Sequence, residues 1–166
     1  MDYLIVIDMQ EDFLRGSLAN PSAVGIIDNV KKVIDNHKGN IIFTLDTHDK
    51  NYLQTQEGKN LPVAHTIKGT DGHKIVPELS GYLNNSNVST LEKTSFGHDD
   101  WNLIDPSQIT IVGTVTEICV VSNAMILKAK YSEVPIRVIA NACAGLTDEN
   151  HNAALNVMAA CQIKII

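Results

Sequence analysis

Cysteine is scarce in this chain: there are three among 166 residues, and no two of them form a CxxC pair. An odd count without such a pair gives no sign of a disulfide framework and favours a reduced, cytoplasmic setting. Basic residues are also few, since 13 Lys and Arg stand against 19 Asp and Glu, and they form no block. The net charge of −6 makes nucleic acid and anionic membranes poor partners and is easier to reconcile with a small neutral or cationic substrate.

Long apolar runs are missing as well. No run approaches the roughly 20 residues that a membrane-spanning helix requires. The first 13 residues lack the basic segment of a signal peptide and carry acidic residues within and after their apolar run, so they predict a strand. The length and a hydrophobic fraction of 44% fit a single domain, residues 1–166, with one apolar core.

Short apolar runs alternate with amphipathic stretches along the chain. Strands are predicted over residues 3–7, 41–45, 88–91, 109–113, 136–140 and 162–166. Helices are predicted over residues 23–37, over 77–83, after Cys119 and from Thr147. Ser22 would begin the first of these helices and Gly39 would end it. This alternation predicts an α/β fold in three layers, with a mostly parallel, doubly wound sheet between helices on both faces.

Two stretches add detail to this prediction. Residues 47–75 show no clear period, and so long a loop inside a compact domain is usually functional. In the helix after Cys119, the apolar residues Val120, Ala124 and Leu127 share one face, and Asn123 is expected on another.

Chemically reactive side chains stand where the predicted strands end. Asp8 follows the first strand, Lys93 the third, and Cys119 lies in the turn after the fourth. Ligands bind at the carboxyl ends of open parallel sheets, so these three groups would converge there, as nucleophilic catalysis requires. Alone, Asp8 can be a cap, Lys93 a solvated surface lysine and Cys119 a small buried hydrophobe. Their joint placement favours catalysis.

The position of Cys119 also leads to an expectation about its proton. The N-terminus of a helix and the Lys93 ammonium would both lower the pKa of the thiol, and the Asp8 carboxylate would oppose them. The two side-chain charges nearly cancel, so either partner of the Cys119–Asp8 pair can carry the proton. Cys143 and Cys161 have no such neighbours, and Cys119 is therefore expected to be the fast-reacting thiol.

Six short segments are spread over nearly the whole chain: VIDMQEDF (6–13), FTLDTH (43–48), KGTDG (68–72), EKTSFG (92–97), GTVTEICV (113–120) and ENHNAAL (149–155). In order and in spacing they resemble the isochorismatase-like cysteine hydrolases, a family that includes the nicotinamidases. The resemblance implies an amidohydrolase that releases ammonia from a small amide, with conversion of nicotinamide to nicotinate as the most specific expectation. The alternatives are hydrolysis of another carbamoyl or ureido amide, and a ligand-binding domain without catalysis.

The same resemblance assigns the catalytic groups. It implies a triad of Asp8, Lys93 and Cys119, in which the cysteine attacks the amide carbonyl and Asp8 moves the proton. It also implies a cis peptide bond between Thr114 and Val115. The backbone N–H groups of Val115 and Cys119 would then form the oxyanion hole.

A metal site is implied as well. The family's ligands fall on Asp46, His48 and His65, with Glu57 where some members have a fourth ligand. Mixed nitrogen and oxygen ligands suit zinc, manganese or iron, and zinc is the first expectation. The simpler alternative is that Asp46 and His48 are only a polar strand end.

The chain departs from the family's pattern near the expected substrate. An aromatic residue common before the second metal histidine is replaced by Pro62 or Leu61, and a common cysteine after it by Thr66. Glu117 replaces the more common aspartate in the nucleophile turn. Phe13 remains as an apolar wall for the substrate, in a chain with one Trp and three Phe. His73 and His98 are expected at the surface, the role of His151 is open, and the resemblance suggests a homo-oligomer.

Overall fold

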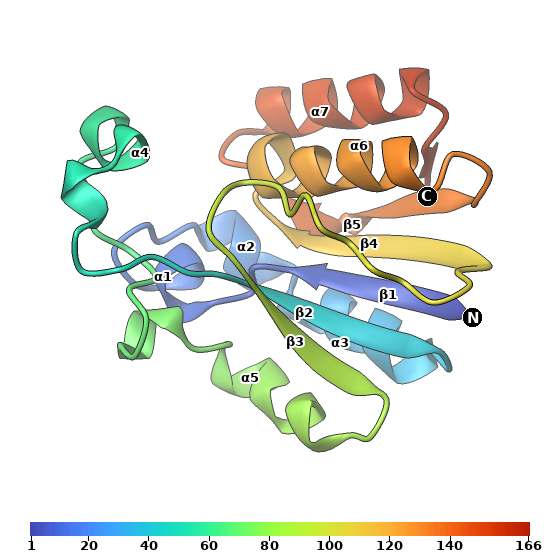
Figure 1. Cartoon of the computed structure of the whole chain (residues 1–166), viewed down its shortest axis with the longest axis horizontal. Helices are drawn as coiled ribbons and strands as arrows, with labels where there is room; N and C mark the ends of the chain where they lie inside the picture. Colours follow the sequence, from blue (N-terminus) through green and yellow to red (C-terminus); the bar gives the residue numbers. More distant parts are fainter.

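Six parallel strands form the central sheet, in the order β3-β2-β1-β4-β5-β6 (Figure 1). The computed structural model describes all 166 residues. The strands are β1 (Asp2–Ile7), β2 (Asn40–Asp46), β3 (Val88–Lys93), β4 (Gln108–Thr114), β5 (Ile136–Ala144) and β6 (Lys164–Ile165). The chain begins in the middle of the sheet, winds to one edge through β3 and then to the other through β6. The predicted three-layer, doubly wound α/β fold is therefore confirmed.

Helices cover both faces of this sheet. One layer contains α1 (Glu11–Leu14), α2 (Pro21–Gly25), α3 (Ile27–Asn36) and α5 (Pro77–Ser80), and the other contains α6 (Val121–Lys130) and α7 (Asp148–Ala160) (Figure 1). In β1, Leu4 and Val6 belong to the first core, whereas Ile5 and Ile7 belong to the second. Because alternate side chains of a strand point to opposite faces, a strand buried on both sides reads as one continuous apolar run.

The first long helix differs from its prediction. It is divided at Ile26 into α2 and α3, and the side chain that caps it is Asn20, whose Oδ1 accepts the N–H of Ser22 at 3.0 Å. Pro21 occupies the first position of α2, where its fixed φ suits the helix and its missing N–H costs nothing. The predictions that Ser22 begins this helix and Gly39 ends it are wrong, since α3 ends at Asn36.

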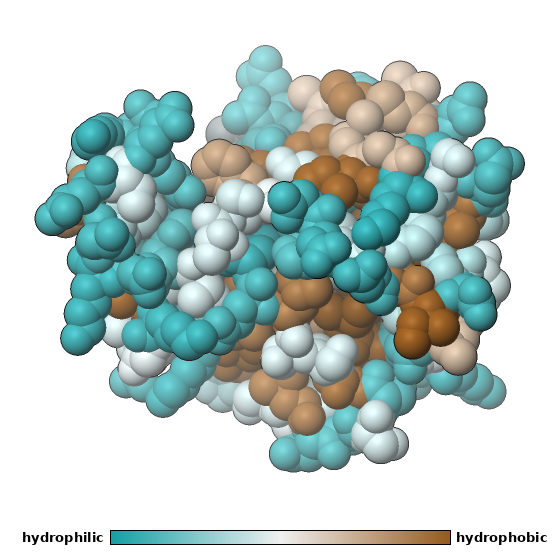
Figure 2. Space-filling model, in the orientation of Figure 1, coloured by the Kyte–Doolittle hydropathy of each residue, from teal (hydrophilic) through white to brown (hydrophobic).

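The long segment between β2 and β3 lies at the carboxyl end of the sheet. It contains the short helix α4 (Gln56–Asn60) and 3-10 turns at Tyr52–Gln54, Asp71–His73 and Gly81–Asn84. Figure 1 shows α4 standing beyond the ends of the strands, and Figure 2 shows the same segment as a largely hydrophilic projection. None of the helices combines the length and the apolar composition needed to cross a membrane.

Candidate active site

The ends of β1 and β3 and the turn after β4 bring Asp8, Lys93 and Cys119 together. The Lys93 Nζ lies 2.7 Å from Asp8 Oδ2 and 3.6 Å from Cys119 Sγ. Lys93 is 2% exposed and Asp8 is fully buried. A lysine this deep in the protein is not the solvated surface residue of the simpler explanation, because burying its ammonium requires a paired charge.

Asp8 is held by a residue that the sequence analysis did not single out. The Thr44 hydroxyl donates to Asp8 Oδ1 at 2.6 Å, and the Asp8 N–H donates to that hydroxyl at 3.1 Å. The other carboxylate oxygen, Oδ2, is buried and forms an ion pair with the Lys93 ammonium at 2.7 Å. Burial raises the pKa of Asp8, while Lys93 and the Thr44 hydrogen bond lower it in part. Asp8 is thus a carboxylate whose two oxygens are held by Thr44 and Lys93.

The Cys119 thiol holds its proton more tightly than its position in the chain predicts. Cys119 lies in a π-helical turn, Thr116–Val120, between β4 and α6, and is 5% exposed. Burial, followed by the negative charge of Asp8, raises the pKa of Cys119 well above its usual value, and Lys93 offsets this only in part. The expected net lowering of this pKa is therefore wrong, although Lys93 does lower it as predicted. The charges of Asp8 and Lys93 do oppose each other, but desolvation of the thiolate changes the pKa of Cys119 more than either charge does. The resting nucleophile is a thiol that needs a base.

Lys93 remains charged between two carboxylates. Besides Asp8, its ammonium contacts Asp46 Oδ1 at 3.1 Å and donates to the carbonyl of Ser95 at 3.1 Å. Burial lowers the pKa of Lys93, but the charges of Asp8, Cys119 and Asp46 together raise it above its usual value. Asp46 therefore links this cluster to the histidines beside it.

Asn123 supports the nucleophile turn from inside the protein. Its side chain donates to the carbonyls of Cys119 at 2.8 Å and Phe96 at 3.0 Å, and it accepts the N–H of His98 at 2.9 Å. The prediction that Asn123 faces away from the packed side of α6 is wrong. Asn123 is fully buried, because each of its polar atoms has a partner there.

Three further histidines, His73, His98 and His151, have structural contacts. His98 is half-buried and packs edge-on against Trp101, with ring centroids 5.4 Å apart. His73, also half-buried, lies 2.8 Å from the Thr47 hydroxyl, and His151 Nδ1 lies 2.8 Å from the Thr116 hydroxyl. His73 and His98 were expected to be surface residues, but both are half-buried, so the expected exposure is wrong.

The two residues expected to form the oxyanion hole lie at one pocket. The Thr114–Val115 peptide bond is cis, and the N–H of Val115 makes no hydrogen bond within the protein. Val115 and Cys119 both line the pocket described below. The structure thus places the two residues assigned to the oxyanion hole side by side.

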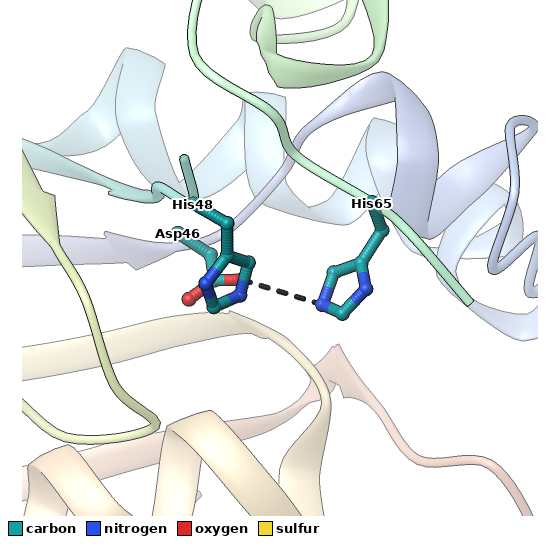
Figure 3. Close-up of side chains that lie close together, drawn as sticks. All are labelled: Asp46, His48 and His65. Carbon is teal, nitrogen blue, oxygen red and sulfur yellow. Dashed lines mark ion pairs between the residues drawn. The ribbon is translucent and has the colours of Figure 1, made fainter. Parts of the chain in front are cut away.

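Asp46, His48 and His65 form a compact group beside the Lys93 ammonium. Each offers one ligand atom, and these atoms lie within 4.8 Å of one another. The Asp46 Oδ2 lies 3.0 Å from His48 Nε2 and 3.7 Å from His65 Nε2, and Figure 3 shows the two imidazoles and the carboxylate converging. From α4, Glu57 Oε1 reaches within 3.5 Å of His48 Nε2 and 3.7 Å of His65 Nε2. All four expected ligands therefore meet.

The chemistry of this group fits a divalent cation. His65 Nδ1 lies 2.8 Å from the Val63 carbonyl, which can only accept, so Nδ1 carries the proton and Nε2 presents a lone pair. His48 Nε2 is buried, and carboxylate oxygens of Asp46 and Glu57 lie 3.0 and 3.5 Å from it. Ligands at about 2.0–2.1 Å from a tetrahedral ion lie about 3.3 Å apart, close to the separations of these atoms. A carboxylate and two imidazole nitrogens gathered at these distances are a donor set that a divalent ion such as zinc binds.

A pocket of about 500 Å³ opens beside both groups. Its lining is mostly hydrophobic and comprises Phe13, Gly16, Ser17, Leu18, Ala19, Asp46, Glu57, Leu61, His65, Phe96, Val115, Ile118, Cys119 and Leu146. Phe13 forms part of one wall, with its ring centroid 5.6 Å from that of His65. A mainly apolar pocket with a few converging polar groups is the usual form of a small-molecule site.

Tyr52 is a further residue of this site that sequence reasoning missed. Its ring packs 4.6 Å from His48 and 4.8 Å from His65, and its hydroxyl donates to the carbonyl of Leu61 at 3.0 Å. Burial and the charge of Glu57 raise the pKa of Tyr52 to about 12, so it stays a neutral wall behind both imidazoles. Nothing in residues 47–75 marks this tyrosine except its place inside a long loop.

Comparisons with known proteins identify the family of the chain. The family model described as the Isochorismatase domain matches residues 2–166. The pyrazinamidase/nicotinamidase from Streptococcus mutans UA159 is similar to the chain, with 29% identity, a TM-score of 0.83 and 100% of each chain covered. The pyrazinamidase of Pyrococcus horikoshii in complex with zinc is similar at 26% identity and a TM-score of 0.79, over 99% of this chain and 98% of that one.

A third structure shares the fold. N-carbamoylsarcosine amidase from Thermoplasma acidophilum is 21% identical, with a TM-score of 0.79 over 99% of this chain and 95% of that one. No curated protein sequence matches the chain. Because the family model covers nearly its whole length, this chain belongs to the isochorismatase family of hydrolases.

Proposed function

We propose that residues 1–166 form one domain that acts as a cysteine amidohydrolase, releasing ammonia from a small amide, with nicotinamide as the first candidate substrate. One observation carries the proposal: a buried cysteine, carboxylate and ammonium are in contact at the wall of a pocket. A binding domain without catalysis gains nothing from burying these groups, because desolvating charges is costly. The similarity to a pyrazinamidase/nicotinamidase supports the choice of substrate.

The geometry supports a two-step reaction. Cys119 Sγ attacks the amide carbonyl while Asp8, its hydrogen-bond neighbour, accepts the thiol proton. Asp8 returns this proton to the nitrogen as the carbon–nitrogen bond breaks, so ammonia leaves and a thioester remains on Cys119. Water then attacks the thioester, Asp8 takes its proton, and the carboxylic acid leaves as the thiol reforms. The N–H groups of Val115 and Cys119 would stabilise the negative oxygen in both steps.

We also propose that Asp46, His48 and His65 hold one zinc ion, with Glu57 beside it. The donor set and its spacing support this, as does the similarity to a pyrazinamidase in complex with zinc. When bound, the ion would supply a Lewis-acidic position for a lone pair of the substrate, next to the pocket that contains Cys119. The protein's own contribution is to fix the tautomer of His65 through the Val63 carbonyl and to shield the site with Tyr52 and Phe13.

A second candidate substrate is a carbamoyl compound. The pocket wall near the second histidine contains Leu61, an aliphatic residue, where many nicotinamidases are expected to have an aromatic one. An aliphatic wall gives an aromatic ring less to stack on. The shared fold with N-carbamoylsarcosine amidase makes this the natural comparison.

Ammonia release from a panel of amides tests the proposal. The panel contains nicotinamide, pyrazinamide, benzamide, N-carbamoyl amino acids and ureido compounds, each offered to zinc-loaded protein. We expect nicotinamide to have the highest kcat/KM, because its ring nitrogen can use the metal position while its carbonyl faces Cys119. Release from a carbamoyl compound alone would overturn the substrate but not the reaction class. No release from any amide would return the chain to the binding-domain alternative.

Thr44→Val tests the role of Asp8. The change removes the hydroxyl that donates to Asp8 Oδ1 and nearly keeps the side-chain shape. Because that hydrogen bond favours the charged carboxylate, its loss raises the pKa of Asp8 further. The acidic limb of the profile of kcat/KM against pH should therefore move to higher pH, and kcat at neutral pH should fall by about tenfold.

Thr110→Val is the matched control for that measurement. Thr110 is equally buried, but it lies on β4 and its hydroxyl accepts a hydrogen bond from Arg137 at 2.7 Å, away from the catalytic cluster. Its pH profile should coincide with that of the wild-type protein. A Thr44→Val profile that also coincides would contradict the role given to Asp8.

A further inference from the structure

Thr66 makes a hydrogen bond through every polar atom it has, and each bond supports the group of Asp46, His48 and His65. Its N–H donates to Asp12 Oδ2 at 2.7 Å, and its carbonyl accepts the N–H of His48 at 3.1 Å. Its hydroxyl donates to Asp46 Oδ2 at 3.0 Å. Thr66 also follows His65 directly in the chain. One fully buried residue thus contacts or adjoins all three members of the group.

The backbone of Thr66 is unusual for its residue type. Its φ is +44°, in the left-handed region that β-branched residues rarely adopt. Such a conformation persists only where the surroundings fix it. Here the two backbone hydrogen bonds fix it, together with the donation of the Lys68 N–H to the His48 carbonyl at 2.8 Å. The conformation is what aims the hydroxyl at Asp46.

Asp12 gives this arrangement a rigid base. Its second oxygen, Oδ1, accepts the N–H of Ser17 at 3.2 Å. Glycines pack against the carboxylate from two sides, since a Cβ at Gly16 or at Gly72 would overlap it. The carboxylate that receives the Thr66 N–H therefore has little freedom to move.

The oxygen that Thr66 contacts is the one that faces the histidines. Asp46 Oδ2 points toward the two imidazole Nε2 atoms, whereas Oδ1 accepts a hydrogen bond from Lys93. A carboxylate oxygen has two lone pairs, so the hydroxyl can occupy one and leave the other for a cation. Hydrogen bonds of this kind orient metal ligands, and losing one typically weakens metal binding by 10- to 100-fold.

We propose that Thr66 is the positioning residue of the metal group, and that its hydroxyl, rather than its bulk, sets the affinity for the ion by orienting Asp46. This inference rests on the proposed zinc site. It gives a chemical reason for a threonine at a position where the family often has cysteine, because a hydroxyl is a much stronger hydrogen-bond donor than a thiol.

The experiment compares zinc affinities of metal-stripped, full-length variants by competition with a chromophoric chelator. Thr66→Val should bind zinc about 10- to 100-fold more weakly than the wild-type protein, and Thr66→Ser, which keeps the hydroxyl, should remain within about threefold. The matched control is Thr47→Val. Thr47 is buried in the same region, but its hydroxyl donates to the Leu45 carbonyl and does not contact the Asp46 carboxylate. The zinc affinity of Thr47→Val should also remain within about threefold of that of the wild-type protein.

The outcomes separate this inference from the proposed metal site. A wild-type protein that binds no zinc overturns both. If the wild-type protein binds zinc and Thr66→Val binds it equally tightly, only the role of the hydroxyl is overturned. The same holds if Thr66→Ser loses as much zinc affinity as Thr66→Val. If the valine variant does not fold, Thr66→Ser and Thr66→Ala provide the same comparison, because they differ by one oxygen. Equal zinc affinities in that pair would also overturn the inference.

Discussion

Cys119→Ala should lower amide hydrolysis by at least ~10³-fold, because it removes the atom that forms the thioester. The rate is measured as ammonia released per protein at saturating substrate. The fold should survive, since the change deletes one sulfur from a turn whose backbone is held by Asn123. Zinc content should also be unchanged, because the metal group does not include Cys119.

Cys161→Ala is the control for this prediction. Cys161 lies just after α7, is half-buried and is not among the residues that line the pocket. Its activity should match that of the wild-type protein. Substantial hydrolysis by a folded, zinc-loaded Cys119→Ala protein would exclude the nucleophile that we propose.

Lys93→Met should abolish activity and also destabilise the protein. The methionine fills much of the same space but leaves Asp8 and Asp46 buried without their shared cation. Removing one partner of a buried ion pair costs about 3–5 kcal/mol, which for a chain of this size corresponds to roughly 6–20 °C in Tm. Thermal unfolding of the metal-free protein, followed by circular dichroism, measures the loss.

The loss should depend on pH. Without the ammonium, the pKa of Asp8, already raised by burial, rises further above its unfolded value. A folded-state pKa above the unfolded value favours folding at low pH. The difference in Tm between variant and wild type should therefore shrink as the pH falls through the raised pKa of Asp8 in the variant.

Lys68→Met is the matched control. Lys68 forms an ion pair with Glu92, but the two side chains are 60% and 43% exposed. Exposed pairs contribute about 0–1 kcal/mol, so Tm should change by no more than a few degrees. A Lys93→Met protein as stable as this control would show that the buried cluster does not need its cation.

Much of the site could be predicted because the sheet itself determines where it lies. The apolar runs of β1 and β2 are clear in the sequence and that of β3 is weak, and the carboxyl ends of parallel strands must share one edge. Asp8, Asp46 and Lys93 are the residues at those ends, so their convergence follows from the strand assignments. Cys119, in the turn after β4, follows from the same argument, whereas only the resemblance connected His65, on the loop after β2, with the site.

Other features depend on packing that no local pattern shows. The pKa of Cys119 is set by burial, and neighbouring charges alone gave the wrong direction. Thr66 takes a backbone conformation that its residue type disfavours, so only its tertiary contacts explain it. The last strand is shorter than predicted, because Gln162 has φ +66° and Ile163 still bonds to the carbonyl of Met158 in α7. In each case tertiary contacts override the local signal.

The central claim is that this chain hydrolyses a small amide through Cys119. Ammonia release by the zinc-loaded wild-type and Cys119→Ala proteins, assayed side by side on the same amides, tests it most directly. We predict release from at least one amide, nicotinamide first, by the wild-type protein and at least ~10³-fold less by the variant. Equal rates for the two proteins, or no release by the wild type from any amide, would contradict the claim.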